Sequence, residues 1–76
     1  MHRRSAPRFV VCLKNSNYPA SLELHKIYRV VPDQQAERDG DLRVIDESGE
    51  DYLYPEDWFS PVELPRRAKH LLLRTR

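Results

Sequence analysis

Prolines divide this sequence into short segments, and that division limits the elements it can form. Its 76 residues include six prolines and only two glycines. Proline lacks a backbone N–H and has a fixed φ, so it interrupts helices and central strands. Apolar residues make up 39% of the chain and charged residues 33%, a polar balance still too rich in Val, Leu and Tyr for a disordered chain. We therefore expect one small folded domain built from short elements.

A chain of this size has a thin hydrophobic core, which limits its chemistry. Small domains bury only about 60% of the surface that the unfolded chain exposes, so we expect no deep cleft for a cofactor and a substrate. Cys12 is the only cysteine and cannot form an internal disulfide. No apolar run reaches the roughly 20 residues that span a bilayer, and the N-terminus has no signal-peptide core. The sequence predicts a reduced, cytoplasmic interaction module without a cofactor, rather than an enzyme.

The charge is segregated along the chain. Residues 1–14 and 65–76 hold four and five basic side chains and no acid, whereas residues 15–64 hold all 12 acids and four basic residues, a net charge of −8. On one interpretation the basic ends bind an anionic partner such as nucleic acid. The residues that would do so are Arg3, Arg4, Arg8, Arg66, Arg67 and Lys69. On the other, the ends fold back on the acidic body or remain solvated.

Apolar and β-branched runs between turn residues predict five short strands. The expected strands are 8–13, 25–31, 42–46, 51–54 and 60–64. The expected non-strand elements are a loop at 14–21, a loop or single helical turn at 34–38, a helical turn at 55–59 and a helix at 65–73. We predict an all-β fold, a small closed barrel over residues 8–64, between a basic arm at 1–7 and a basic tail at 65–76.

The expected core follows from the same patterns. Alternation of Leu22 and Leu24 with Glu23 predicts that both leucines face inward. The predicted core residues are Val11, Leu22, Leu24, Val30, Val44 and Phe59. In the tail, Ala68, Leu71 and Leu72 share one stripe of the expected helix, and Leu71, Leu72 and Leu73 need a surface to bury against. We expect this tail to be an assembly element, packed on its own barrel, a second copy or a foreign partner.

The segment from Gly49 to Val62 resembles the end of an SH3 domain. In that family a hairpin leads to a Gly-Tyr-Ile-Pro-Ser-Asn-Tyr-Val motif, one 3₁₀ turn and a closing strand. Here Pro55 stands at the family's proline, Trp58 at its tyrosine and Phe59 at its core valine. Phe9–Val11 and Leu22–Leu24 resemble the opening strand and the segment after the first long loop. The chain is similar in this respect to small SH3-like proteins of bacteria and phages, and the resemblance implies a five-stranded SH3-like barrel.

Departures from the family pattern bear on the ligand. The family's proline-peptide groove needs aromatic side chains from three places. The opening Ala-Leu-Tyr-Asp-Tyr motif is replaced by 11–15, which has no aromatic residue, and the family's tryptophan falls on Gly40 or Asp41. Alignment also puts Arg43 at a small core position, whereas the apolar pattern favours Leu42 and Val44 inside. The resemblance thus implies the fold without ordinary Pro-x-x-Pro recognition.

Aromatic and acidic residues concentrate after the predicted hairpin. The candidate partner-binding residues are Tyr18, Tyr52, Tyr54, Pro55, Glu56, Asp57 and Trp58. Exposed aromatics beside acids would suit a partner protein or peptide that carries Arg or Lys. Tyr52 and Tyr54 share one strand face and Leu53 lies on the other. Either the tyrosines are core, or Leu53 is core and both tyrosines form an outer patch.

No metal or catalytic site is predicted. The three histidines and Cys12 are far apart in sequence and form no ligand pair. The acidic run 46–51 lacks the alternating ligands of a calcium loop and is typical of a solvated hairpin tip. Two functions remain: a protein-interaction module that uses the region of Trp58, and a nucleic-acid-binding small barrel that uses the basic ends. The acidic body repels phosphate, which favours the first.

Overall fold

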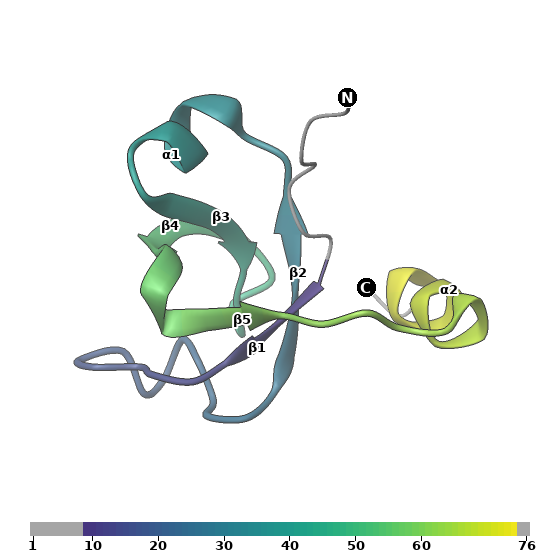
Figure 1. The fold of residues 1–76 in the computed structure, drawn as a ribbon. Helices are drawn as coiled ribbons and strands as arrows, with labels where there is room; N and C mark the ends of the chain where they lie inside the picture. The colour runs from purple at the N-terminus through teal and green to yellow at the C-terminus, as the bar shows by residue number, and fades with distance from the viewer. Residues whose placement is uncertain (1–8, 75–76) are drawn as a thin grey trace.

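The described part of the chain is a single antiparallel sheet with three short helical elements. A computed structural model describes residues 9–74, with side chains up to Leu71 (Figure 1). The elements are β1 (Phe9–Cys12), β2 (Ile27–Val31), α1 (Gln34–Arg38), β3 (Asp41–Ile45), β4 (Asp51–Pro55), the 3₁₀ turn η1 (Glu56–Trp58), β5 (Phe59–Pro61) and α2 (Arg66–Arg74). The five strands run in the order β4-β3-β2-β1-β5. The predicted all-β character is confirmed at this level.

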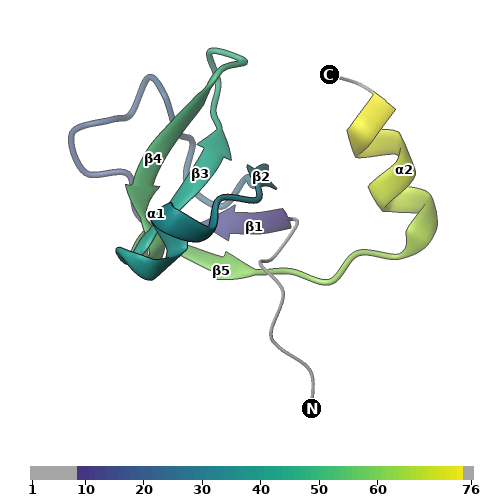
Figure 2. The ribbon, with the colours of Figure 1, turned by 90° about the horizontal axis from the view of Figure 1, so that it is seen from above.

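The sheet is open, which corrects the prediction of a closed barrel. β4 pairs only with β3, and β5 pairs only with β1, so within the described residues no strand ladder joins the two edges. Instead η1 carries the chain from one edge to the other, and the rings of Tyr54 and Phe59 meet with their centroids 6.2 Å apart. The edges are therefore linked by the connection through η1 and by this ring pair, and not by a strand ladder (Figures 1 and 2 show the path of the chain).

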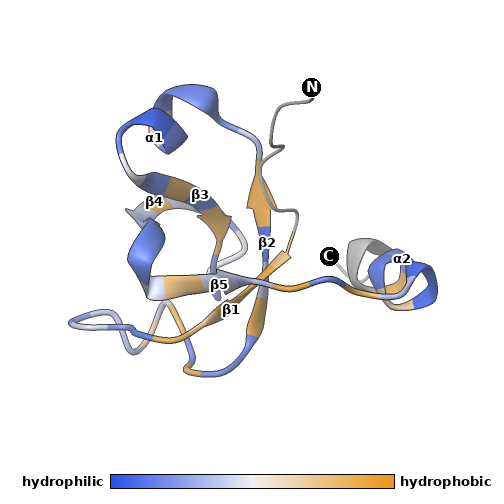
Figure 3. Cartoon of the chain, in the orientation of Figure 1, coloured by the Kyte–Doolittle hydropathy of each residue, from blue (hydrophilic) through white to orange (hydrophobic). Residues whose placement is uncertain are grey.

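One face of the sheet carries the core. The buried cluster consists of Val10, Cys12, Leu22, Tyr28, Val30, Leu42, Val44, Tyr54 and Phe59. On β3 the apolar pattern predicts the register correctly, because Leu42 and Val44 are buried and Arg43 between them is only half-buried. Arg43 turns to the opposite face, where its guanidinium pairs with Asp33 at 2.8 Å. In Figure 3 the apolar residues lie along the strands, and α1 and η1 are polar.

Two of the six predicted core residues are not buried. Leu24 is 45% exposed and Val11 is half-buried, whereas Leu22 is fully buried. The alternation argument fails because the chain at 22–26 turns rather than extends, with His25 at φ 67. Strand β2 accordingly begins at Ile27 and not at residue 25. On β1, Val11 points away from the core side that its neighbours Val10 and Cys12 occupy.

The helical elements follow local capping chemistry. Asp33 caps α1 by accepting a hydrogen bond from the Ala36 N–H at 3.0 Å, and Ala36 is buried. Of the two predictions for 34–38, a loop or a single helical turn, the helical turn is confirmed. Pro55 is the last residue of β4, and the predicted helical turn begins one residue later than expected. β5 is shorter than the predicted 60–64 and pairs Pro61 with Val10 at the sheet edge, where a missing N–H is tolerated.

Helix α2 lies apart from the sheet. A four-residue segment, 62–65, leads from β5 to α2, and both views show the helix beyond the end of β5 and away from η1 (Figures 1 and 2). Its Leu71 side chain is 51% exposed. The predicted helix is therefore present, and in this structure it does not pack across the acidic body of its own chain.

Truncation of Phe59 and of Leu24 should separate a core residue from an exposed one. Phe59 is 7% exposed, so Phe59→Ala should lower the free energy of unfolding by about 3–5 kcal/mol. Leu24→Ala removes a side chain that is nearly half exposed and should cost about 0.5 kcal/mol or less. Urea unfolding of both variants measures the difference. Equal losses would contradict the assignment of the two residues to inside and outside.

Candidate functional site

Three aromatic rings from distant parts of the chain form one cluster. The ring centroids of Tyr18 and Tyr54 are 5.6 Å apart, those of Tyr18 and Trp58 5.9 Å, and those of Tyr54 and Trp58 6.1 Å. These separations lie within the range of favourable aromatic pairing. Tyr54 is buried, Trp58 is half-buried and Tyr18 is 49% exposed, so the cluster runs from the core to the surface.

The first loop folds on itself and thereby presents Tyr18. The Tyr18 N–H donates to the Asn15 carbonyl at 2.8 Å, and the Tyr18 carbonyl accepts from the N–H groups of Ser21 and Leu22 at 3.1 and 3.0 Å. The side chain of Asn15 closes the loop by donating to the Leu22 carbonyl at 2.8 Å. Since Leu22 is fully buried, it anchors this loop to the core. The prediction that Tyr18 can reach the aromatic residues near Trp58 is confirmed in the geometry.

Trp58 is held by backbone hydrogen bonds on both sides of η1. The Glu56 N–H donates to the Gly40 carbonyl at 2.9 Å, and the Trp58 carbonyl accepts from the Leu13 N–H at 2.7 Å. Gly40 has φ 86, a left-handed conformation that favours glycine at the turn before β3. Leu13 is itself 52% exposed. The Trp58 side chain is therefore carried by η1, which is bonded to the turn at Gly40 and to the chain at Leu13.

Four acids lie on η1 or on the segment next to it. Glu56 and Asp57 are exposed on η1, and Asp41 pairs with Pro55 across the β3–β4 ladder. Asp39 is exposed in the turn just before Gly40. In the part of the chain that the structure describes, none of these four carboxylates forms an ion pair within 4 Å. We call the surface formed by Tyr18, Pro55, Glu56, Asp57 and Trp58 the Trp58 face.

The two tyrosines of β4 differ in burial, which corrects both alternatives drawn from strand alternation. Tyr54 is buried at 4% exposure, whereas Tyr52 is 51% exposed and Leu53 is 47% exposed. β4 is an edge strand, and only its end next to η1 lies over the core. The Tyr52 ring forms no stacking pair with the described aromatic side chains, so it is not part of the Trp58 face.

A buried carboxylate lies beneath the cluster. Asp46 is 5% exposed, and it accepts hydrogen bonds from the Tyr54 hydroxyl at 2.5 Å and from the Ser48 hydroxyl and N–H at 2.6 and 2.9 Å. Burial disfavours its charged form, but these donors outweigh burial and lower the pKa of Asp46. Burial and the Asp46 charge raise the pKa of Tyr54 to about 12. The prediction of a wholly solvated hairpin tip is therefore wrong at Asp46.

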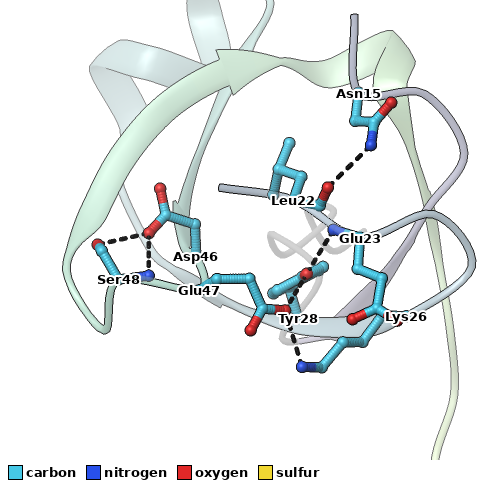
Figure 4. A network of polar contacts seen from close by, with 8 residues as sticks. All are labelled: Asn15, Leu22, Glu23, Lys26, Tyr28, Asp46, Glu47 and Ser48. Atoms are coloured by element: carbon cyan, nitrogen blue, oxygen red, sulfur yellow. Dashed lines mark hydrogen bonds and ion pairs between the residues drawn. The ribbon is translucent and has the colours of Figure 1, made fainter. Parts of the chain in front are cut away.

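The neighbouring Glu47 ties the hairpin to the first loop. Its carboxylate accepts from the Tyr28 hydroxyl and pairs with the Lys26 ammonium at 2.7 Å (Figure 4). Its N–H donates to the Ser21 carbonyl at 2.9 Å. The hydrogen bonds from Lys26 and Tyr28 lower the pKa of Glu47. The Tyr28 hydroxyl also accepts from the Glu23 N–H at 2.8 Å. Tyr18 is thus carried on a loop that is braced against the β3–β4 hairpin.

The basic residues proposed for nucleic acid do not gather at this site. Arg66 and Arg67 are exposed on α2 and Lys69 is half-buried there, on the side of the molecule away from η1. Arg3, Arg4 and Arg8 lie outside the described residues. Among residues 9–74, no helix has the length and apolar character to cross a membrane, and no three metal-ligating side chains come together.

Sequence reasoning found Tyr18 and Trp58 but missed the residues that support them. Asp39, Asp41 and Leu13 reach the site through pairings between distant segments, which local patterns do not reveal. The polar spacing of Asp46 and Ser48 was a signal for a local side-chain turn, since a carboxylate often accepts from the N–H two residues on. No family model, curated protein or solved structure matches this chain.

Removal of the Tyr54 hydroxyl should change the dependence of stability on pH. Tyr54 ionises at about 12 in the folded protein and near 10.0 when unfolded, so its contribution is present below pH 10 and is lost between pH 10 and 12. Tyr54→Phe should lower the free energy of unfolding by about 1.5–3 kcal/mol at neutral pH, because Asp46 loses a donor. The difference in the free energy of unfolding between wild type and Tyr54→Phe should decrease by up to roughly 1.4 kcal/mol per pH unit above pH 10. Urea unfolding from pH 7 to 11.5 measures this, and a gap that stays constant would contradict it.

Proposed function

We propose that this chain is an SH3-like protein-interaction module that binds a cationic segment of a partner through the Trp58 face. The observation that carries the proposal is the half-exposed pair of Tyr18 and Trp58, whose ring centroids lie 5.9 Å apart beside exposed carboxylates. Guanidinium and ammonium groups bind the faces of tryptophan and tyrosine, and desolvation strengthens the contact. The rings provide apolar contact area, and the acids provide charge and steer association.

The SH3-like part of the proposal has topological support. The β3–β4 hairpin leads through η1 to β5, and β5 pairs with β1 along Val10–Cys12. This is the order of elements that the resemblance of Gly49–Val62 implies. The proposal does not require a closed strand ladder, because the Trp58 face is assembled from η1 and the first loop.

The ligand class follows from which aromatics are present. Tyr18 and Trp58 together form one exposed aromatic site, and Tyr54 contributes its ring from below. A polyproline helix needs a row of such sites, whereas one arginine or lysine side chain with an adjacent apolar residue needs only one. The exposed Glu56 and Asp57 favour the cationic ligand.

The proposal predicts binding of a basic peptide, which the single tryptophan can report. An octapeptide of alternating arginine and leucine should change Trp58 fluorescence with a Kd below about 1 mM, and an octapeptide of alternating glutamate and leucine should not. Tyr18→Ala should weaken binding by about tenfold, since one cation–π partner is lost. The double variant Glu56→Gln/Asp57→Asn, made in the wild-type chain, should also weaken binding of the arginine peptide, and the loss should be largest at low salt.

The matched control is Tyr52→Ala. It removes an equally exposed tyrosine that is outside the Trp58 face, so affinity should stay within about twofold of wild type. Circular dichroism of each variant checks that the sheet is intact. Equal binding of the arginine and glutamate peptides, or equal losses in Tyr18→Ala and Tyr52→Ala, would contradict the proposal.

A further inference from the structure

We propose that the cationic segment bound by the Trp58 face is helix α2 of a second copy of this chain, so that the protein associates head to tail. This inference rests on the proposed function, because it uses the same face and names its occupant. Three observations carry it: the isolation of α2, its charge, and its position relative to η1.

Helix α2 is separated from the strands among the described residues. It has nine residues and lies apart from the sheet in both views (Figures 1 and 2). An isolated helix of that length is marginal in water, and most helical stability comes from packing of one face. Its Leu71 side chain is 51% exposed, four residues after the exposed Arg67. Residues four apart are neighbours on a helix, so a cation and an apolar side chain are presented side by side.

The charges of α2 and the Trp58 face are complementary. α2 contains Arg66, Arg67, Lys69 and Arg74 and no acid. Glu56 and Asp57 on η1, with Asp39 and Asp41 beside them, form no ion pair among the described residues. Lys14 is exposed in the segment that follows the Leu13–Trp58 hydrogen bond, and Arg38 ends α1, so the acids outnumber the cations around the site. An arginine of α2 would meet both rings there, together with carboxylates that no described cation pairs with.

The position of α2 favours contact between copies. β5 begins next to Trp58 and carries the chain away from it, and four residues, 62–65, separate the end of β5 from the start of α2. In Figure 1 the turn before β5 and α2 lie at opposite ends of β5, with the sheet between them, and Figure 2 shows α2 beyond the end of β5. The contact joins α2 of one copy to the Trp58 face of the next, so it is heterologous. Such a contact adds further copies to the chain of subunits, unless the rotation between successive copies closes them into a ring.

Sedimentation and light scattering of the full chain test this proposal. The average mass should rise above the monomer with protein concentration, and association should weaken as salt is added. Arg66→Glu/Arg67→Glu should weaken self-association by at least about tenfold, and so should Glu56→Lys/Asp57→Lys. A mixture of the two variants should associate again, because each reversed surface meets a complementary one. The matched control, Glu50→Lys/Glu63→Lys, makes the same charge change at exposed positions outside the Trp58 face and should associate at least as well as wild type.

Other outcomes overturn the inference in distinguishable ways. If the chain stays monomeric while the arginine–leucine peptide still binds Trp58, the inference fails and the proposed function stands. If association requires α2 but ignores Glu56→Lys/Asp57→Lys, α2 docks elsewhere and the inference fails. If a monomeric chain binds duplex DNA, with loss of binding in Arg66→Glu/Arg67→Glu and a steep salt dependence, α2 serves nucleic acid instead.

Discussion

The hydrogen bond between the Tyr54 hydroxyl and the buried Asp46 carboxylate is the contact on which the candidate site depends. It fixes the end of β4 against the start of the hairpin, and it sets the plane of the ring that Tyr18 and Trp58 contact. A buried carboxylate is costly unless donors surround it, and here Ser48 and Tyr54 provide three hydrogen bonds. Tyr54 therefore contributes both to the stability of the fold and to the geometry of the proposed binding face.

The open sheet explains why side chains carry so much of the architecture. Because β4 and β5 are both edges, the ladder does not hold η1 in place. Its position depends on the Gly40 and Leu13 backbone contacts and on the Tyr54–Phe59 ring pair. Glu47 fixes the position of the first loop, since it contacts Lys26, Tyr28 and Ser21 at once. A thin core is thus supplemented by polar contacts between loops.

The distribution of charge gives the molecule two unlike ends. The acidic residues around η1 and the basic residues of α2 lie at opposite sides of the sheet. Among the described residues, two surfaces of opposite charge are thus held apart by the sheet. This separation is what links the proposed binding face to the proposed association between copies.

The sequence alone determined the number and order of the strands, the turn after Pro55, the inward register of Leu42 and Val44 and the helix that follows Pro65, because each depends on local periodicity or on proline and cap chemistry. It did not determine where β2 begins or where β5 begins and ends. Tertiary structure decided the exposure of Leu24, which follows from a turn with positive φ at His25. It also decided that Tyr54 is buried while Tyr52 is exposed, because only one end of an edge strand covers the core. Tertiary structure also decided the burial of Asp46, since Tyr54 arrives from another strand to donate a hydrogen bond that adds to the two from the nearby Ser48.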